Sequence, residues 1–158
     1  MSLPSTASSP SSHPVLSCTD GAAVMWQEFL LLVGRVLLGL VFLIYGWDQI
    51  LDLAAFAKTF PPRGLAPWMA YVAGPVDLVG GIALVLGIGT RYAALVMLLF
   101  TVVAEFSSHA YWSVVPAQHG NQRAHFWKDV SICGGCLLLF VTAGGRYSLD
   151  YLLSRKRG

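Results

Sequence analysis

Four apolar segments alternate with short polar connections along the chain, and this alternation is its most informative pattern. The segments run over about 28–46, 69–87, 91–112 and 126–143. Each is close to the roughly 20 residues that an α-helix needs to cross about 30 Å of hydrocarbon. The pattern predicts an all-α fold, a transmembrane four-helix bundle.

The tryptophans support these segments independently, because indole prefers the interface between membrane and water. All five lie at the ends of predicted segments: Trp26, Trp47, Trp68, Trp112 and Trp127. The connection from Trp47 to Trp68 places leucines and phenylalanines among charges, which is typical of a short amphipathic helix lying in the interface.

Composition excludes most soluble classes. Hydrophobic residues make up 56% of the 158 residues and charged residues 11%, with a mean hydropathy of +0.64, whereas an ordinary soluble domain has roughly 25% charged residues. The net charge of +2 is scattered, so we expect no nucleic-acid partner. The chain has no phosphate-binding glycine loop and no nucleophile elbow, and therefore gives no support to a nucleotide-binding or hydrolase function.

The two ends differ from the membrane domain, which we expect to cover 25–153. Residues 1–24 are rich in Ser and Pro and predict a disordered tail, without the basic and apolar regions of a signal peptide. Residues 154–158 form a basic tail. Six basic residues fall on one side of a four-crossing chain and four on the other, which predicts that both termini are cytoplasmic. The six are Arg35, Arg91, Arg146, Arg155, Lys156 and Arg157, and the four are Lys58, Arg63, Arg123 and Lys128.

Several short strings carry a resemblance to a known family. They occur in the order Gly-Arg-Val-Leu-Leu-Gly at 34–39, Asp-Leu-Val-Gly-Gly at 77–81, Leu-Gly-Ile-Gly-Thr-Arg at 86–91, Phe-Trp-Lys-Asp at 126–129 and Gly-Gly-Arg-Tyr-Ser-Leu-Asp at 144–150. In order and spacing they resemble the DoxX family of small bacterial membrane proteins, over roughly residues 31 to 155. The resemblance implies four transmembrane helices in the bacterial cytoplasmic (inner) membrane and a link to respiratory or redox complexes.

The chain departs from the usual DoxX pattern at four positions. Asp77 stands where the family more often has Glu, and Asp129 where Asn is usual. Cys133 and Cys136 flank a Gly-Gly pair where small or apolar residues are expected.

Ionisable residues inside a membrane need partners or a function, because each costs at least about 2.5 kcal/mol to insert. The predicted topology sorts them into two layers. Arg35, Arg91 and Arg146 fall near the cytoplasmic side, where snorkelling to phospholipid headgroups explains them as structural anchors.

The outer layer is richer in chemistry. Glu105 and His109 are four residues apart and share one helix face, as do His125 and Asp129. We expect six side chains to meet in the outer half of the bundle: Asp77, Glu105, His109, His125, Lys128 and Asp129.

Three interpretations of this outer cluster remain open. The first is a buried ion-pair network of Asp77 or Glu105 with Lys128 and the histidines, which fixes the helix register. The second is a quinone site, in which His109 or His125 hydrogen-bonds a quinone carbonyl and Asp77 or Glu105 passes protons. The third is a metal site, with Glu105, His109, His125 and Asp129 as candidate ligands on two facing helices.

Cys133 and Cys136 have the C-x-x-C spacing of redox thiols. That motif normally needs an exposed helix N-terminus to favour the thiolate, whereas these cysteines lie about two turns inside a lipid-facing helix. Small buried thiols beside a glycine contact are the favoured interpretation, with redox chemistry as the alternative.

The favoured function is a DoxX-like membrane subunit that supports redox or respiratory electron transfer, with quinone as the candidate cofactor. We expect it to act in the lipid bilayer beside a peripheral or membrane redox protein, and homo-oligomers are an open alternative. The second hypothesis is a non-catalytic membrane scaffold or transport accessory protein.

Overall fold

The computed structural model describes residues 21–108 and 110–156, and these form helices and turns with no strand. The predicted all-α class is therefore confirmed. The α-helices are α1 Gly21–Leu51, α2 Leu53–Lys58, α3 Ala70–Leu86, α4 Thr90–Ser108, α5 Pro116–Thr142 and α6 Leu149–Arg155. Three short 3-10 helices join them: η1 Pro61–Arg63, η2 Pro67–Met69 and η3 Tyr111–Ser113.

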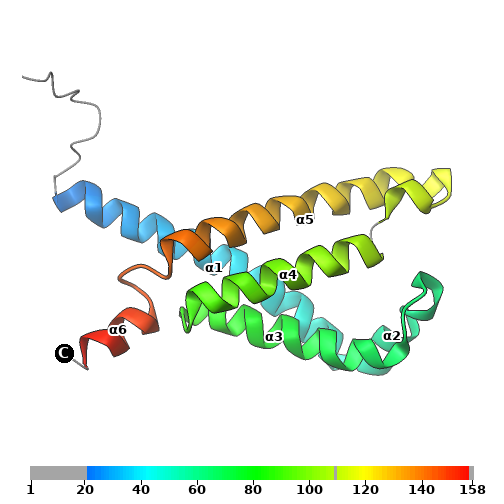
Figure 1. The fold of residues 1–158 in the computed structure, drawn as a ribbon, viewed down its shortest axis with the longest axis horizontal. Helices are drawn as coiled ribbons and strands as arrows, with labels where there is room; N and C mark the ends of the chain where they lie inside the picture. The colour runs from blue at the N-terminus through cyan, green and yellow to red at the C-terminus, as the bar shows by residue number, and fades with distance from the viewer. Residues whose placement is uncertain (1–20, 109, 157–158) are drawn as a thin grey trace, which may run out of the picture.

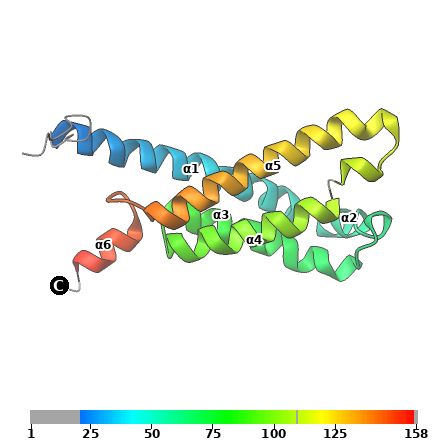
Figure 2. The same ribbon diagram turned by 45° about the horizontal axis from the view of Figure 1, so that its top comes forward.

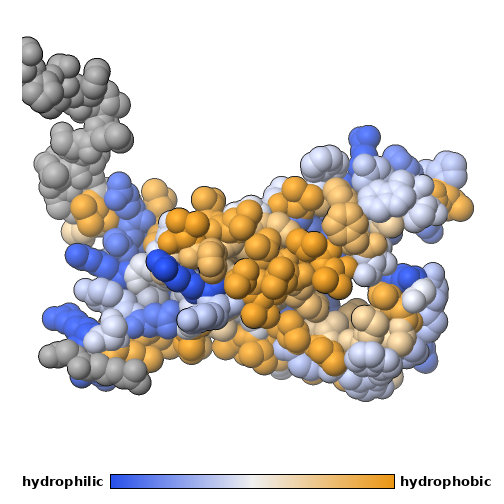
Figure 3. All heavy atoms as spheres, viewed as in Figure 1, coloured by the Kyte–Doolittle hydropathy of each residue, from blue (hydrophilic) through white to orange (hydrophobic). Residues whose placement is uncertain are grey.

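Four segments of the described chain are long and apolar enough to cross a membrane. They are Val24–Leu51, Pro67–Leu86, Thr90–Ser113 and Pro116–Thr142. Figure 3 shows hydrophobic residues gathered over the middle of one face of the molecule, with hydrophilic residues toward both of its ends. This banding is what a bilayer demands of a spanning bundle.

Two helices begin earlier than hydropathy predicts. α1 starts at Gly21, so the last residues of the expected disordered tail are helical, and residues 1–20 lie outside the described residues. α5 starts at Pro116 rather than near residue 126. Its first three turns are polar and carry no apolar period, so hydropathy missed them, although proline at the first helical position favours a helix start.

The four long helices pack as two close pairs, α1 with α3 and α4 with α5. Glycines bring α1 and α3 together, because a Cβ on Gly46 would meet the backbone of Leu78 and one on Gly81 would meet the backbone of Leu43. Such small-residue contacts drive helix association in lipid, where no hydrophobic effect does so.

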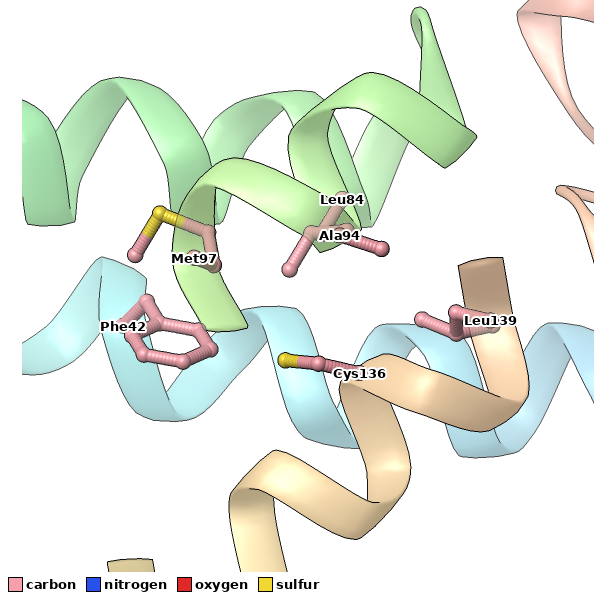
Figure 4. Packing of buried hydrophobic residues seen from close by; sticks show 6 residues of the cluster. All are labelled: Phe42, Leu84, Ala94, Met97, Cys136 and Leu139. Carbon is pink, nitrogen blue, oxygen red and sulfur yellow. The ribbon is translucent and has the colours of Figure 1, made fainter. Parts of the chain in front are cut away.

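The two pairs join around a small apolar core (Figure 4). Its side chains come from all four long helices and are at most 6% exposed: Phe42, Leu84, Ala94, Met97, Cys136 and Leu139. Most other apolar side chains face outward, as they do on a lipid-facing surface.

Figures 1 and 2 show that the beginning of α1, the turn between α3 and α4, and α6 lie toward one end of the bundle. We call this the terminal end. α2 and the beginning of α5 lie at the opposite, distal end. The predicted short helix between Trp47 and Trp68 is α2, with the two 3-10 helices that follow it.

Candidate functional site

The terminal end contains a buried polar cluster, which we call the terminal lock: Arg35, Gly87, Thr90, Ser148 and Asp150. Arg35 is only 1% exposed. Its Nη1 donates to the carbonyl of Gly144 at 3.2 Å and its Nη2 to that of Tyr147 at 2.9 Å. The expectation that Arg35 snorkels to headgroups is therefore wrong. α1 crosses the loop before α6 at this point, and the carbonyl groups of that loop accept hydrogen bonds from the guanidinium.

Asp150 of α6 closes the same lock by capping α4. Its carboxylate accepts from the amide groups of Gly89 at 2.7 Å and Thr90 at 2.8 Å, and from the Thr90 hydroxyl at 3.0 Å. Burial raises the pKa of Asp150, but these hydrogen bonds and the nearby Arg35 outweigh it and hold the pKa below its ordinary value. The dipole of α4 also stabilises a negatively charged carboxylate at its N-terminus.

The other two predicted anchors are exposed. Arg91 donates to the carbonyl of Val141 at 3.4 Å from the surface. Arg146 is exposed as well, and its backbone amide donates to Glu28 at 2.6 Å. Their role as anchors in the membrane interface stays a prediction.

The distal half contains a cavity of about 530 Å³ between the two helix pairs. Aromatic and aliphatic side chains form most of its wall, among them Phe42, Phe56, Phe60 and Trp68. The polar side chains that line it on the long helices include Tyr45, Gln49, Asp77, Lys128 and Asp129. A mostly apolar cavity with a few convergent polar groups is the usual form of a small-molecule site.

Asp77 lies in the cavity wall on α3 and is 7% exposed. It accepts a hydrogen bond at 3.1 Å from the side-chain amide of Gln49 on α1. Because a carboxylate can only accept, this contact directs the NH2 group of Gln49 toward Asp77 and leaves its Oε1 turned away. That oxygen is buried and accepts no hydrogen bond from the described residues.

Lys128 and Asp129 bring the charged part of α5 to the cavity. The Nζ of Lys128 lies 3.3 Å from a carboxylate oxygen of Asp129 and 3.5 Å from Nδ1 of His125. It also lies 5.1 Å from the centre of the Tyr45 ring, which links α5 to α1 through a cation–π contact. Lys128 and Asp129 thus form an ion pair at the cavity, and the wider network of the first interpretation stays a prediction.

Glu105 lies behind this wall on α4. It is 4% exposed, and neither of its carboxylate oxygens accepts a hydrogen bond from a described donor. The carboxyl group of Asp129 faces it. Two acids therefore adjoin each other at the seam between α4 and α5.

The metal interpretation cannot be followed to its full ligand set, since His109 lies outside the described residues. Among the residues whose placement is described, no three His, Cys, Asp or Glu side chains stand close enough to hold a metal ion. The set of Glu105, His109, His125 and Asp129 stays a prediction.

The two thiols on α5 are free and occupy different surroundings. Cys136 is fully buried and its sulfur points into the apolar core shared with Phe42 and Met97 (Figure 4). Cys133 is half-buried and lies close enough to Asp129 and Glu105 for their charges to act on it. Neither lies at a helix N-terminus, the position that activates C-x-x-C thiols.

Comparison with protein families decides the identity of this bundle. The DoxX family model matches residues 30–110. The chain belongs to the DoxX family.

This chain is similar to two proteins of Escherichia coli (strain K12) over most of their length. Inner membrane protein YphA is 32% identical over 126 residues, which cover 78% of this chain and 90% of that protein. Inner membrane protein YqjF is 32% identical over 125 residues, which cover 79% of this chain and 92% of that protein. CatD of Bacillus subtilis (strain 168), whose name describes it provisionally as an oxidoreductase, is 29% identical over 65 residues, 41% of this chain and 48% of its own. No solved structure matches this chain.

Sequence reasoning missed three polar residues that matter in this DoxX bundle. Tyr45 and Gln49 are four apart on α1 and line the cavity, and a lone Gln after an apolar helix was the available signal. Asp150 appeared only as part of the Tyr-Ser-Leu-Asp string, although its carboxylate caps a helix about 60 residues away in sequence.

Proposed function

We propose that this DoxX protein is a membrane subunit that supports redox or respiratory electron transfer by binding a quinone in the distal cavity. The observation that carries the proposal is the cavity itself. Its volume of about 530 Å³ lies within the range of roughly 300–1,000 Å³ typical of small-molecule sites. Its aromatic wall suits a flat, apolar ring.

The residues of the cavity fit a quinone chemically. Lys128 carries N–H donors that can hydrogen-bond a quinone carbonyl oxygen. Asp77 on the opposite helix pair accepts from Gln49 and, as an acceptor, fits a hydroxyl group of the reduced quinone. A quinone, when bound, supplies two-electron chemistry coupled to proton uptake. The chain's own part is to seat the ring, exclude water and hold protons near it.

The proton-handling residues remain those that the sequence suggests: Asp77, Glu105, His109 and His125. Asp77 lines the cavity and Glu105 lies behind it. His125 stands beside Lys128 at the distal end. Imidazole suits proton transfer because its ordinary pKa is near neutrality.

A test of this function needs a change that fills the cavity without removing charge. Ala104 of α4 lines the cavity, so Ala104→Trp should abolish binding of decylubiquinone to the purified protein in lipid nanodiscs. Ala55 of α2 is exposed and outside the cavity wall, so Ala55→Trp is the matched control and should bind as the wild type does. Wild-type protein that binds no decylubiquinone, or an Ala104→Trp variant that binds normally, would overturn the proposal.

The location follows from the relatives and the charge bias. The names of the two Escherichia coli proteins describe inner membrane proteins, and we place this chain in the bacterial inner membrane with both termini in the cytoplasm. Arg155 and Lys156 lie at the terminal end, where positive charge favours the cytoplasmic face. A C-terminal tag that resists protease in inverted vesicles would contradict this orientation.

The second candidate function is a non-catalytic scaffold or transport accessory protein. The observation in its favour is that the Lys128–Asp129 ion pair and the terminal lock both have structural explanations. Gentle detergent purification separates the two candidates. A redox subunit copurifies with quinone, haem, flavin or a redox protein, and a scaffold carries none of them.

A further inference from the structure

Glu105 is the buried ionisable residue of the bundle whose surroundings are hardest to reconcile with a charge. It lies on α4 within the third membrane-spanning segment and is 4% exposed. Both carboxylate oxygens are shielded from solvent and receive no hydrogen bond from the described residues. An ionised carboxylate left in this way costs several kcal/mol.

No described residue neutralises Glu105 by donating a hydrogen bond to it. Asp129 adjoins it from α5, and Lys128, whose charge also acts on Glu105, is paired with Asp129 at 3.3 Å. Cys133 of α5 is also within range of the charge of Glu105. The described ionisable groups around this seam also include His125 of α5, 3.5 Å from Lys128. Asp77 of α3 interacts with Asp129, and the ring of Tyr45 of α1 lies under Lys128.

Two carboxylates that adjoin in a region of low dielectric constant cannot both be ionised without a second cation. One proton between them resolves the conflict, because a protonated carboxyl donates a hydrogen bond to its ionised neighbour. We propose that Glu105 and Asp129 form a carboxyl pair that shares one proton, and that this pair is the proton store of the distal cavity.

The pair is placed to exchange that proton with the cavity. Asp129 lines the cavity, whereas Glu105, which adjoins Asp129, is not among the residues of the cavity wall. A proton that leaves the pair breaks an O–H bond at Asp129 and forms one at an oxygen of the ligand. The pair then carries two negative charges and must take up another proton, so it supplies protons and no electrons. The identification of the ligand as a quinone rests on the proposed function. The proton shared by Glu105 and Asp129 is argued independently of any quinone.

Dicyclohexylcarbodiimide tests the shared proton directly, because it is apolar and reacts with protonated carboxyl groups. The carboxyl O–H adds across the carbodiimide to give an acylisourea, which rearranges to a stable acylurea with no leaving group. In full-length protein in lipid vesicles at neutral pH, we expect labelling at Glu105 or Asp129, read by peptide mass spectrometry. The exposed Asp48 of α1 should stay unlabelled.

Glu105→Gln isolates the pair. The amide of the variant can donate to Asp129, which then needs no proton, so labelling of Asp129 should be lost. Asp48→Asn, the matched control, should label as the wild type does, and Glu105→Asp should restore labelling in part. Continued labelling of Asp129 in Glu105→Gln would show that the proton does not depend on the pair and would overturn the proposal.

Infrared spectroscopy checks the same point without any reagent. The wild type should show a protonated-carboxyl C=O band that is missing from Glu105→Gln and present in Asp48→Asn. Identical bands in all three proteins would overturn the proposal. Because neither measurement needs a quinone, a protein that labels as expected and binds no decylubiquinone would retain the carboxyl pair and lose the proposed function.

Discussion

The terminal and distal ends of this bundle handle buried polar groups in opposite ways. At the terminal end, Arg35 and Asp150 are surrounded by matching donors and acceptors. At the distal end, Glu105 and the Oε1 of Gln49 are buried without hydrogen bonds among the described residues. The terminal end also packs closely around Gly87, whereas the distal end surrounds a cavity of about 530 Å³.

This contrast suggests that the polar groups of the terminal end stabilise the fold, whereas those of the distal end serve ligand or proton binding. Satisfied buried polar groups fix one arrangement of the chain, whereas an unsatisfied one is costly and is retained where a ligand or proton completes it. Substitutions in the terminal lock should therefore lower stability and leave ligand binding by the folded protein unchanged. The following changes test that expectation.

The largest loss should come from Arg35→Met. It leaves the carbonyl groups of Gly144 and Tyr147 without their donor and Asp150 without its nearby cation, at a cost of about 3 kcal/mol in the free energy of unfolding. Thermal unfolding in detergent measures the change. Arg91→Met is the matched control, since Arg91 is exposed, and should cost less than about 0.5 kcal/mol. If both variants lose the same free energy of unfolding, the hydrogen bonds of the terminal lock contribute no additional stability.

Gly87→Ala should give the next largest loss. Gly87 has φ +71°, and a Cβ there would collide with the Arg35 guanidinium and lie 2.6 Å from the Cβ of Ser148. We expect a cost of about 2–3 kcal/mol from strain and overpacking together. Gly64 at the distal end has φ +73° and nothing within 4 Å, so Gly64→Ala carries the backbone strain alone, about 1 kcal/mol. If the two variants unfold at the same temperature, close packing around Arg35 contributes nothing.

Asp150→Asn should give the smallest loss of the three, about 1.5–2 kcal/mol at neutral pH. Because the pKa of Asp150 is lowered in the folded protein, its ionisation stabilises the fold above the unfolded pKa near 4 and the benefit is lost as the pH falls through the folded value. The gap between wild type and variant should be constant above about pH 5 and shrink below about pH 4. A gap independent of pH would contradict the role of the charge.

Hydropathy was enough to place the four membrane-spanning helices, because lipid requires long apolar segments whatever their packing. It failed for the first turns of α5, which are polar and extend beyond the apolar segment. It also grouped Arg35 with Arg91, since both are single arginines at the same end of the bundle. Only the packing of α1 against the loop before α6 distinguishes the buried guanidinium from the exposed one.

For the candidate site, too, the sequence predicted some features and only the structure revealed the others. The sequence placed Asp77, Glu105, Lys128 and Asp129 in one half of the bundle, since helix ends alternate between the two faces of a membrane. It could not show that Gln49 pairs with Asp77, or that Asp129 lines the cavity while Glu105 lies behind it. His109, which the sequence also placed there, lies outside the described residues.

By itself, then, the sequence determined that this protein lies in lipid, the number of its crossings, its DoxX resemblance and the half of the bundle that holds Asp77, Glu105 and Asp129. These properties depend on hydrophobicity and on order along the chain. The tertiary structure alone decided which charges are satisfied, because a hydrogen bond such as that between Thr90 and Asp150 joins groups far apart in sequence. The distance and direction between side chains on different helices are set by packing, which hydropathy does not encode.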